Sequence, residues 1–219
     1  PYEGYWLVFD PETSAMDPSV QKEFNLKEIK LADKWTISYP GKDTVYKTTA
    51  KSLTLAGSEL SENLMQSAYD DSKWKYSSFI GGQNPKGADQ KKEAADTGSY
   101  CYWRVNIPVG SRSVLFPDNM TGTTVWIDGT KTSLSTALTD LPGNARLLSF
   151  ARPVKSEHVP TDPLKFIIGD KANCALQSWY DYGLQQYSGY IDYEMPVVVK
   201  DVTVKTVIDL GKVKYMAEV

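Results

Sequence analysis

The chain has 219 residues, of which 41% are hydrophobic and 23% charged, a balance typical of a globular protein with a substantial core. Its net charge of −3 argues against a nucleic-acid-binding protein, which usually carries a basic patch. No apolar run reaches the roughly 18 residues that a membrane-spanning helix needs, and the length fits one large β domain or two smaller units.

The first half of the chain contains one helical pattern and one polar stretch. Apolar residues recur at helical spacing from Leu60 to Ala68, which predicts one short helix over Ser58–Tyr69. The stretch 81–98 (GGQNPKGADQKKEAADTG) is polar and interrupted by glycines. It predicts a long exposed loop.

Strand patterns dominate the rest of the chain. Tyr100–Ile107 alternates apolar and polar residues, and Thr123–Ile127 and Lys131–Leu134 flank Asp128-Gly129, a pair favoured in type I′ hairpin turns. Further strands are predicted at 147–150, 164–168, 189–195, 202–210 and 213–219. Short strands punctuated by proline and glycine predict an all-β protein, either an antiparallel sandwich or a jelly roll.

Residues suited to catalysis are few. The single histidine, His158, lies in a proline-flanked loop, and no GxSxG motif supplies a nucleophile for a triad. Carboxylates are plentiful, and by residue type alone the candidates for a glycosidase pair are Asp70, Asp71, Asp181, Asp192 and Glu194. The last two lie two residues apart in a predicted strand, an arrangement more common on a solvated strand face. The sequence therefore assigns no catalytic residue and leaves open whether the chain belongs to an enzyme.

No metal or cofactor site is predicted. Cys101 and Cys174 lie in no CxxC motif and near no histidine at ligand spacing, so two buried free thiols are favoured over a zinc site. A disulfide between them is the alternative in an oxidising compartment. A structural calcium ion is left open, although no calcium-binding motif supports one.

Aromatic residues gather in "LQSWYDYGLQQYSGYIDYEMP", residues 176–196, which holds one tryptophan and five tyrosines. Flat rings beside carboxylates and amides suit pyranose sugars, whose ring faces are apolar and whose rims carry hydroxyls. The candidate carbohydrate-binding residues are Trp179, Tyr180, Asp181, Tyr182 and Trp74. The alternative is that these rings pack in the core and at sheet edges.

Four motifs in chain order resemble the sugar-binding jelly-roll domain of family 2 glycoside hydrolases. They are Asp70–Trp74 (DDSKW), Tyr102–Pro108 (YWRVNIP), Thr124–Gly129 (TVWIDG) and Leu141–Asn144 (LPGN). This chain has Asp128 where that family usually has asparagine. The resemblance implies a β-sandwich of the galactose-binding-domain type.

Three other segments resemble the α-L-rhamnosidases of family 106. Trp179–Glu194 and 207–219 (VIDLGKVKYMAEV) are similar to a region near the C-terminus of those enzymes, and 5–10 (YWLVFD) looks like the strand that opens the same module. Because these segments lie at opposite ends of the chain, the resemblance implies a split outer sandwich formed by 1–64 and 171–219. A second jelly roll at 65–170 would be inserted into it.

The resemblance also carries expectations about function. It implies a truncated, non-catalytic accessory region of a secreted or periplasmic bacterial glycoside hydrolase, which would contact a polysaccharide or oligosaccharide through aromatic residues in its end loops. Catalysis would reside on a barrel domain of the same polypeptide. Two alternatives stay open: a fragment that contributes to a rhamnosidase-type active site, and a structural or adhesin-like sandwich without a ligand.

Overall fold

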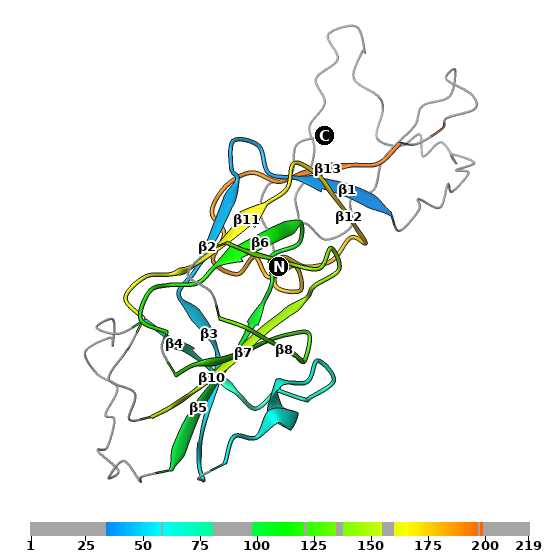
Figure 1. Ribbon diagram of the computed structural model, residues 1–219. Coiled ribbons are helices and arrows are strands. Elements are labelled where there is room, and N and C mark those ends of the chain that lie inside the picture. Colours follow the sequence, from blue (N-terminus) through cyan, green and yellow to red (C-terminus); the bar gives the residue numbers. More distant parts are fainter. Residues whose placement is uncertain are drawn as a thin grey trace, which may run out of the picture. The chain divides into compact units, whose positions relative to one another are not determined.

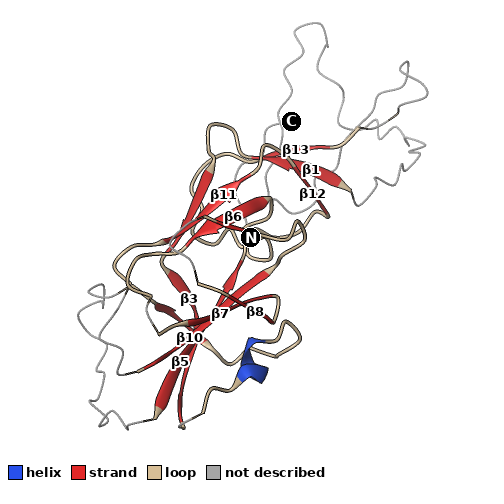
Figure 2. Cartoon of the chain, in the orientation of Figure 1, coloured by secondary structure: helices blue, strands red, loops and turns tan. Residues whose placement is uncertain are grey.

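The computed structural model describes residues 34–57, 59–80, 98–120, 122–134, 138–154, 160–196 and 198. The described part is built almost entirely of strands, and its single helical element is the four-residue 3-10 helix η1 (Glu62–Met65) (Figure 2). All the strand pairings are antiparallel. The prediction of an all-β antiparallel sandwich is confirmed.

The strands form three sheets (Figure 1). The six-stranded sheet has the order β4 (Lys75–Ser78), β3 (Thr49–Ala56), β5 (Ser99–Asn106), β10 (Leu147–Pro153), β7 (Thr124–Ile127) and β8 (Thr130–Thr132). The four-stranded sheet has the order β2 (Thr44–Lys47), β11 (Leu164–Ile168), β6 (Ser111–Leu115) and β9 (Thr139–Asp140). The three-stranded sheet has the order β12 (Ala172–Cys174), β1 (Trp35–Ser38) and β13 (Asp192–Glu194).

The main hydrophobic core lies between the six-stranded and the four-stranded sheets, because it draws buried side chains from both. Trp103 and Phe150 stack at 5.2 Å in the six-stranded sheet, and Phe166 and Val114 are fully buried in the four-stranded sheet. Thr48 alone separates β2 from β3, so the chain passes from one sheet to the other within one residue. This is the two-layer packing expected of a sandwich.

The opposite face of the six-stranded sheet, here called its outer face, carries a group of charged and aromatic residues. Residues paired across antiparallel strands share a face, so the pairing of Lys51 with both Arg104 and Tyr76 places all three there. Part of the outer face is covered by residues 60–74. Together with strands β5, β7 and β10, this segment forms a second buried cluster whose members are Leu64, Met65, Trp74, Tyr102, Trp126 and Ala151.

The predicted strands at 100–107, 147–150 and 164–168 are confirmed as β5, β10 and β11. The predicted hairpin is also confirmed: β7 pairs with β8, and Asp128 and Gly129 both have positive φ, as a type I′ turn requires. The Asp128 carboxylate accepts hydrogen bonds from the backbone N–H groups of Arg146 and Leu147, which ties the turn to the start of β10.

The predicted helix over 58–69 is wrong except for η1. The guanidinium of Arg104 donates hydrogen bonds to the backbone carbonyls of Leu64 at 2.7 Å and Gln66 at 2.9 Å. Those carbonyls would accept from N–H groups four residues later in a continuous α-helix. The buried arginine therefore holds this segment in an open, irregular course.

Several predictions lie outside the described residues: the strands at 5–10, 202–210 and 213–219, the loop at 81–97, and His158. Strands from both predicted sandwich ranges pair with one another, for example β3 with β5, and the predicted domain boundaries stay a prediction. Cys101 and Cys174 are free, the second of them buried. Among the described residues, no helix is long and apolar enough to span a bilayer.

Candidate functional site

Two of the predicted binding residues, Trp74 and Tyr182, are buried. The Trp74 side chain is 7% exposed and packs against Tyr69, at a centroid distance of 6.0 Å, and against the Arg104 guanidinium. Tyr182 is 3% exposed, and its hydroxyl donates to the carbonyl of Ala175. Because both rings are buried, neither offers an open face for stacking on a sugar, so the prediction that these two rings present binding faces is corrected.

The other three predicted residues share one exposed turn. Trp179 and Tyr180 are 39% and 43% exposed. The Asp181 carboxylate accepts a hydrogen bond from the Ser178 hydroxyl at 2.6 Å, while the Asp181 N–H donates to the same hydroxyl, so this carboxylate caps the turn. Trp179 is held from the other side, because its indole N–H donates to the Tyr193 hydroxyl at 3.0 Å. Whether these residues bind a ligand stays a prediction.

Gly183 allows this turn to lie against the sandwich. Its φ is +68°, and a β-carbon built there would lie 2.6 Å from the backbone oxygen of Asn106 and 2.8 Å from that of Ile107. The clash would be with backbone at the end of β5, which cannot move aside as a side-chain tip could.

We therefore expect Gly183→Ala to lower the free energy of unfolding by about 1–2 kcal/mol from the left-handed backbone alone, with the clash adding to it. Urea denaturation monitored by tryptophan fluorescence measures the change. Gly143→Ala is the matched control, because a β-carbon there meets nothing within 4 Å and its φ is not in the left-handed region. Equal stabilities for the two variants would contradict this account of the turn.

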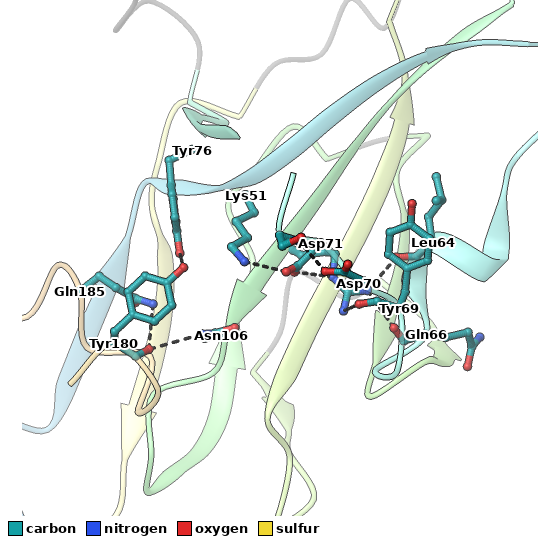
Figure 3. A network of polar contacts seen from close by, with 12 residues as sticks. Lys51, Leu64, Gln66, Tyr69, Asp70, Asp71, Tyr76, Asn106, Tyr180 and Gln185 are labelled. Carbon is teal, nitrogen blue, oxygen red and sulfur yellow. Dashed lines mark hydrogen bonds and ion pairs between the residues drawn. The ribbon is translucent and has the colours of Figure 1, made fainter. Parts of the chain in front are cut away.

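Tyr76 on β4 completes the aromatic part of the site. Its hydroxyl donates to the Tyr180 hydroxyl at 2.6 Å, and the two rings meet edge to face at 6.2 Å (Figure 3). Burial, followed by the hydrogen bond and charge of Tyr180, raises the pKa of Tyr76 well above its ordinary value, so its hydroxyl stays protonated. The sequence analysis missed Tyr76, which lies in a short edge strand rich in serine and lysine.

A charged cluster lies next to the two tyrosines on the outer face. The Asp71 carboxylate is shared: one oxygen lies 2.6 Å from Lys51 Nζ and the other 2.9 Å from Arg104 Nε (Figure 3). Partial burial alone would lower the pKa of Lys51, but the hydrogen bond and charge of Asp71 outweigh it and the pKa is raised. Lys51 therefore stays charged, and together with Arg104 it holds Asp71 in place.

Gln185 joins the turn to the strands below it. Its side-chain amide donates to the Tyr180 carbonyl at 3.0 Å, and its side-chain oxygen accepts from Lys47 Nζ at 2.7 Å. Asn106 makes a second, longer contact to the same carbonyl, at 3.4 Å. Lys47 itself is 2% exposed, and burial lowers its pKa to about 8. A buried cation thus lies directly beneath the turn.

These contacts define what we call the tyrosine surface: Tyr76, Tyr180, Lys51, Asn106 and Gln185. It offers two exposed aromatic rings together with amide and ammonium donors, the combination that recognises sugars by stacking and hydrogen bonding. Each oxygen of the Asp71 carboxylate is engaged by a cation, one by Lys51 and the other by Arg104. The arrangement suits binding rather than acid–base catalysis.

The remaining carboxylate candidates lie elsewhere. Asp192 and Glu194 are both exposed on β13, as their spacing predicted, and Glu194 pairs with Lys171 at 2.6 Å. Asp70 accepts a hydrogen bond from the Ser72 N–H, which lowers its pKa, and it closes a turn. Within the described ranges, no group of three or more metal-ligating residues lies close enough to hold an ion.

Comparison with known proteins gives little. No protein-family model matches the chain, and no curated protein matches it. Among solved structures, it is similar to the crystal structure of a beta-glycosidase from Bacteroides vulgatus, with 13% sequence identity and a TM-score of 0.36. The match covers 59% of this chain and 20% of that structure, so the chain spans about a fifth of the length of this neighbour.

Proposed function

We propose that this chain is a non-catalytic carbohydrate-binding region of a glycoside hydrolase, and that it contacts glycans through the tyrosine surface and Trp179. The observation that carries the proposal is the exposed Tyr76–Tyr180 pair, flanked by Lys51, Asn106 and Gln185. The hydroxyls of these two rings are already held by a hydrogen bond in the free protein. Such rings lose less side-chain entropy when a ligand stacks on them. The resemblance of the sequence motifs to family 2 and family 106 enzymes supports the same assignment.

The proposal also covers the location of the protein and the domain that would accompany this chain. A secreted or periplasmic location, and a catalytic barrel on the same polypeptide, follow from the sequence resemblance. The binding region would hold the polysaccharide near that barrel and raise its local concentration.

A glycan array followed by calorimetric titration tests the proposal. We expect Tyr180→Ala and Trp179→Ala each to weaken glycan binding by about tenfold, because a stacking contact of about 1–1.5 kcal/mol is lost. Tyr46→Ala is the control, since Tyr46 is an exposed tyrosine on β2 of the four-stranded sheet and lies outside the tyrosine surface. Binding that is unchanged in both turn variants would remove the tyrosine surface from the proposal.

A ligand-free structural sandwich is the second candidate, and the burial of Trp74 and Tyr182 favours it. It predicts no binding to any glycan of the array. The hydrolase-fragment alternative predicts turnover of nitrophenyl glycosides by this chain alone, whereas our proposal predicts none.

A further inference from the structure

The charges around the tyrosine surface do not balance. Lys51 and Arg104 share the single carboxylate of Asp71. Lys47 adds a third cation, which has no carboxylate within 4 Å in the described part of the chain. It donates instead to the neutral side-chain amide of Gln185. Direct ion pairs therefore leave two positive charges uncompensated beside the exposed tyrosines.

Other acidic groups nearby do not cancel this excess. Asp70 and Asp181 are exposed, and each is engaged by its own turn, through the Ser72 N–H and the Ser178 hydroxyl respectively. Neither lies in an ion pair among the described residues. Exposed carboxylates in water act weakly over distance because solvent and salt screen them. Tyr76 contributes no negative charge, since its hydroxyl stays protonated.

Lys47 is placed to act on a ligand that it does not touch. Two hydrogen bonds, from Lys47 to Gln185 and from Gln185 to the Tyr180 carbonyl, separate it from the exposed turn. Because Lys47 is buried, its field passes through protein of low dielectric rather than water, so it decays less with distance. Lys51 is partly exposed and can donate directly to a ligand.

We propose that the tyrosine surface binds an acidic sugar, with the ring against Tyr180 and its carboxylate or sulfate group held near Lys51 and Gln185. This proposal rests on the proposed function and deepens it by naming the ligand's charge. The anionic group supplies the missing countercharge for Lys47 and Lys51. Neutral sugars gain only the stacking and hydrogen-bonding contacts.

Pairs of glycans that share one sugar chain and differ only in charge test whether the acidic group contributes to binding. The probes are polygalacturonate with its methyl ester, and a sulfated galactan with its desulfated form. We expect each acidic member to bind at least about tenfold more tightly than its neutral counterpart in calorimetric titration. That preference should shrink as salt rises from about 50 mM to about 500 mM, because screening weakens the charge contact.

Two variants assign the preference to the lysines. Lys47→Met removes a charge that does not touch the ligand, and Lys51→Gln removes the direct donor. We expect each to weaken binding of the acidic glycan by about fivefold. Lys47→Met should leave the neutral counterpart unchanged, whereas Lys51→Gln should weaken the neutral counterpart less than the acidic glycan, because it also removes a hydrogen-bond donor. Lys165→Met on β11 is the control, because Lys165 pairs with Tyr46 and therefore lies on the opposite face of the four-stranded sheet from Lys47. Circular dichroism confirms that every variant is folded.

The outcomes separate this inference from the proposed function. Equal binding of acidic and neutral partners, or of the wild type and both lysine variants to the acidic glycan, overturns the acidic-sugar proposal while carbohydrate binding stands. Absence of binding to any glycan of the array and the pairs overturns both. Tight binding of acidic glycans that Lys47→Met weakens supports the proposal.

Discussion

Replacement of Arg104 by methionine is expected to lower the free energy of unfolding by about 3–5 kcal/mol. The buried guanidinium donates to Asp71 through Nε, to the Leu64 and Gln66 carbonyls through Nη1, and to the Tyr69 carbonyl through Nη2. Methionine fills a similar volume but removes all four of these hydrogen bonds. Asp71 keeps Lys51 and the Gln66 carbonyl keeps the Tyr69 N–H, whereas the Leu64 and Tyr69 carbonyls lose the donors that Arg104 supplied. The cost is the desolvation of unpaired groups rather than lost apolar contact.

Urea denaturation followed by circular dichroism measures this loss. Arg112→Met is the control, because Arg112 is exposed and its ion pair with Asp170 is long, at 3.9 Å, so a change below about 0.5 kcal/mol is expected. Arg104→Lys should recover only part of the loss, since one ammonium cannot reproduce the planar fork of the guanidinium. A loss below about 1 kcal/mol for Arg104→Met would show that residues 60–74 are held by their apolar contacts instead.

Much of the sandwich could be predicted because its central strands follow local patterns. In β5 the alternation of Trp103 and Val105 with Tyr102 and Arg104 sets the two faces, and the Asp128-Gly129 turn sets the register of β7 with β8. Strands β1 to β3 were not predicted. Their serine, threonine and lysine residues weaken the hydrophobic alternation, and β3 has only Ala50 fully buried.

The candidate site could be predicted only in part, because exposure of an aromatic ring depends on distant partners. From the sequence, both Trp74 and Trp179 were predicted to bind carbohydrate. In the structure Trp74 packs beneath Arg104, which follows it by 30 positions in the chain, whereas Trp179 lies on an open turn. Tyr76 gains its role from Tyr180, a contact across 104 positions that no local pattern indicates.

The burial of Lys47 could have been predicted from the sequence. Val45 and Lys47 lie two residues apart in β2, so a strand that buries Val45 must point Lys47 toward the same side. A lysine on the buried face of a strand is costly unless it is paired or serves a function. Period-two alternation in the sequence "TVYK" could therefore have marked this residue.

Lys47→Met is expected to raise the free energy of unfolding at pH 7 by about 2–3 kcal/mol. Burial lowers the pKa of Lys47 from its ordinary 10.5 to about 8, which corresponds to a penalty of roughly 3 kcal/mol for holding the charge in the folded state. Methionine removes that penalty and packs its side chain in the same place. The lost hydrogen bond costs little, because Gln185 is exposed and water can replace the lysine.

The stabilisation by Lys47→Met is expected to depend on pH. Between about pH 8 and pH 10.5, Lys47 is protonated in the unfolded chain but largely neutral in the folded one, so the unfolded state binds more protons. The stability contribution of the wild-type lysine therefore rises with pH through this window and is lowest below it. The gain from Lys47→Met should be largest near pH 7 and shrink toward pH 10.

The difference between the wild type and the variant, measured by urea denaturation at each pH, cancels the titration of the tyrosines common to both. A gain that stays constant from pH 7 to pH 10 would contradict a desolvated Lys47. A variant that is more stable and yet binds acidic glycans less tightly would show that the folded chain retains this charge at the expense of stability, because a ligand supplies the counterion that the protein lacks.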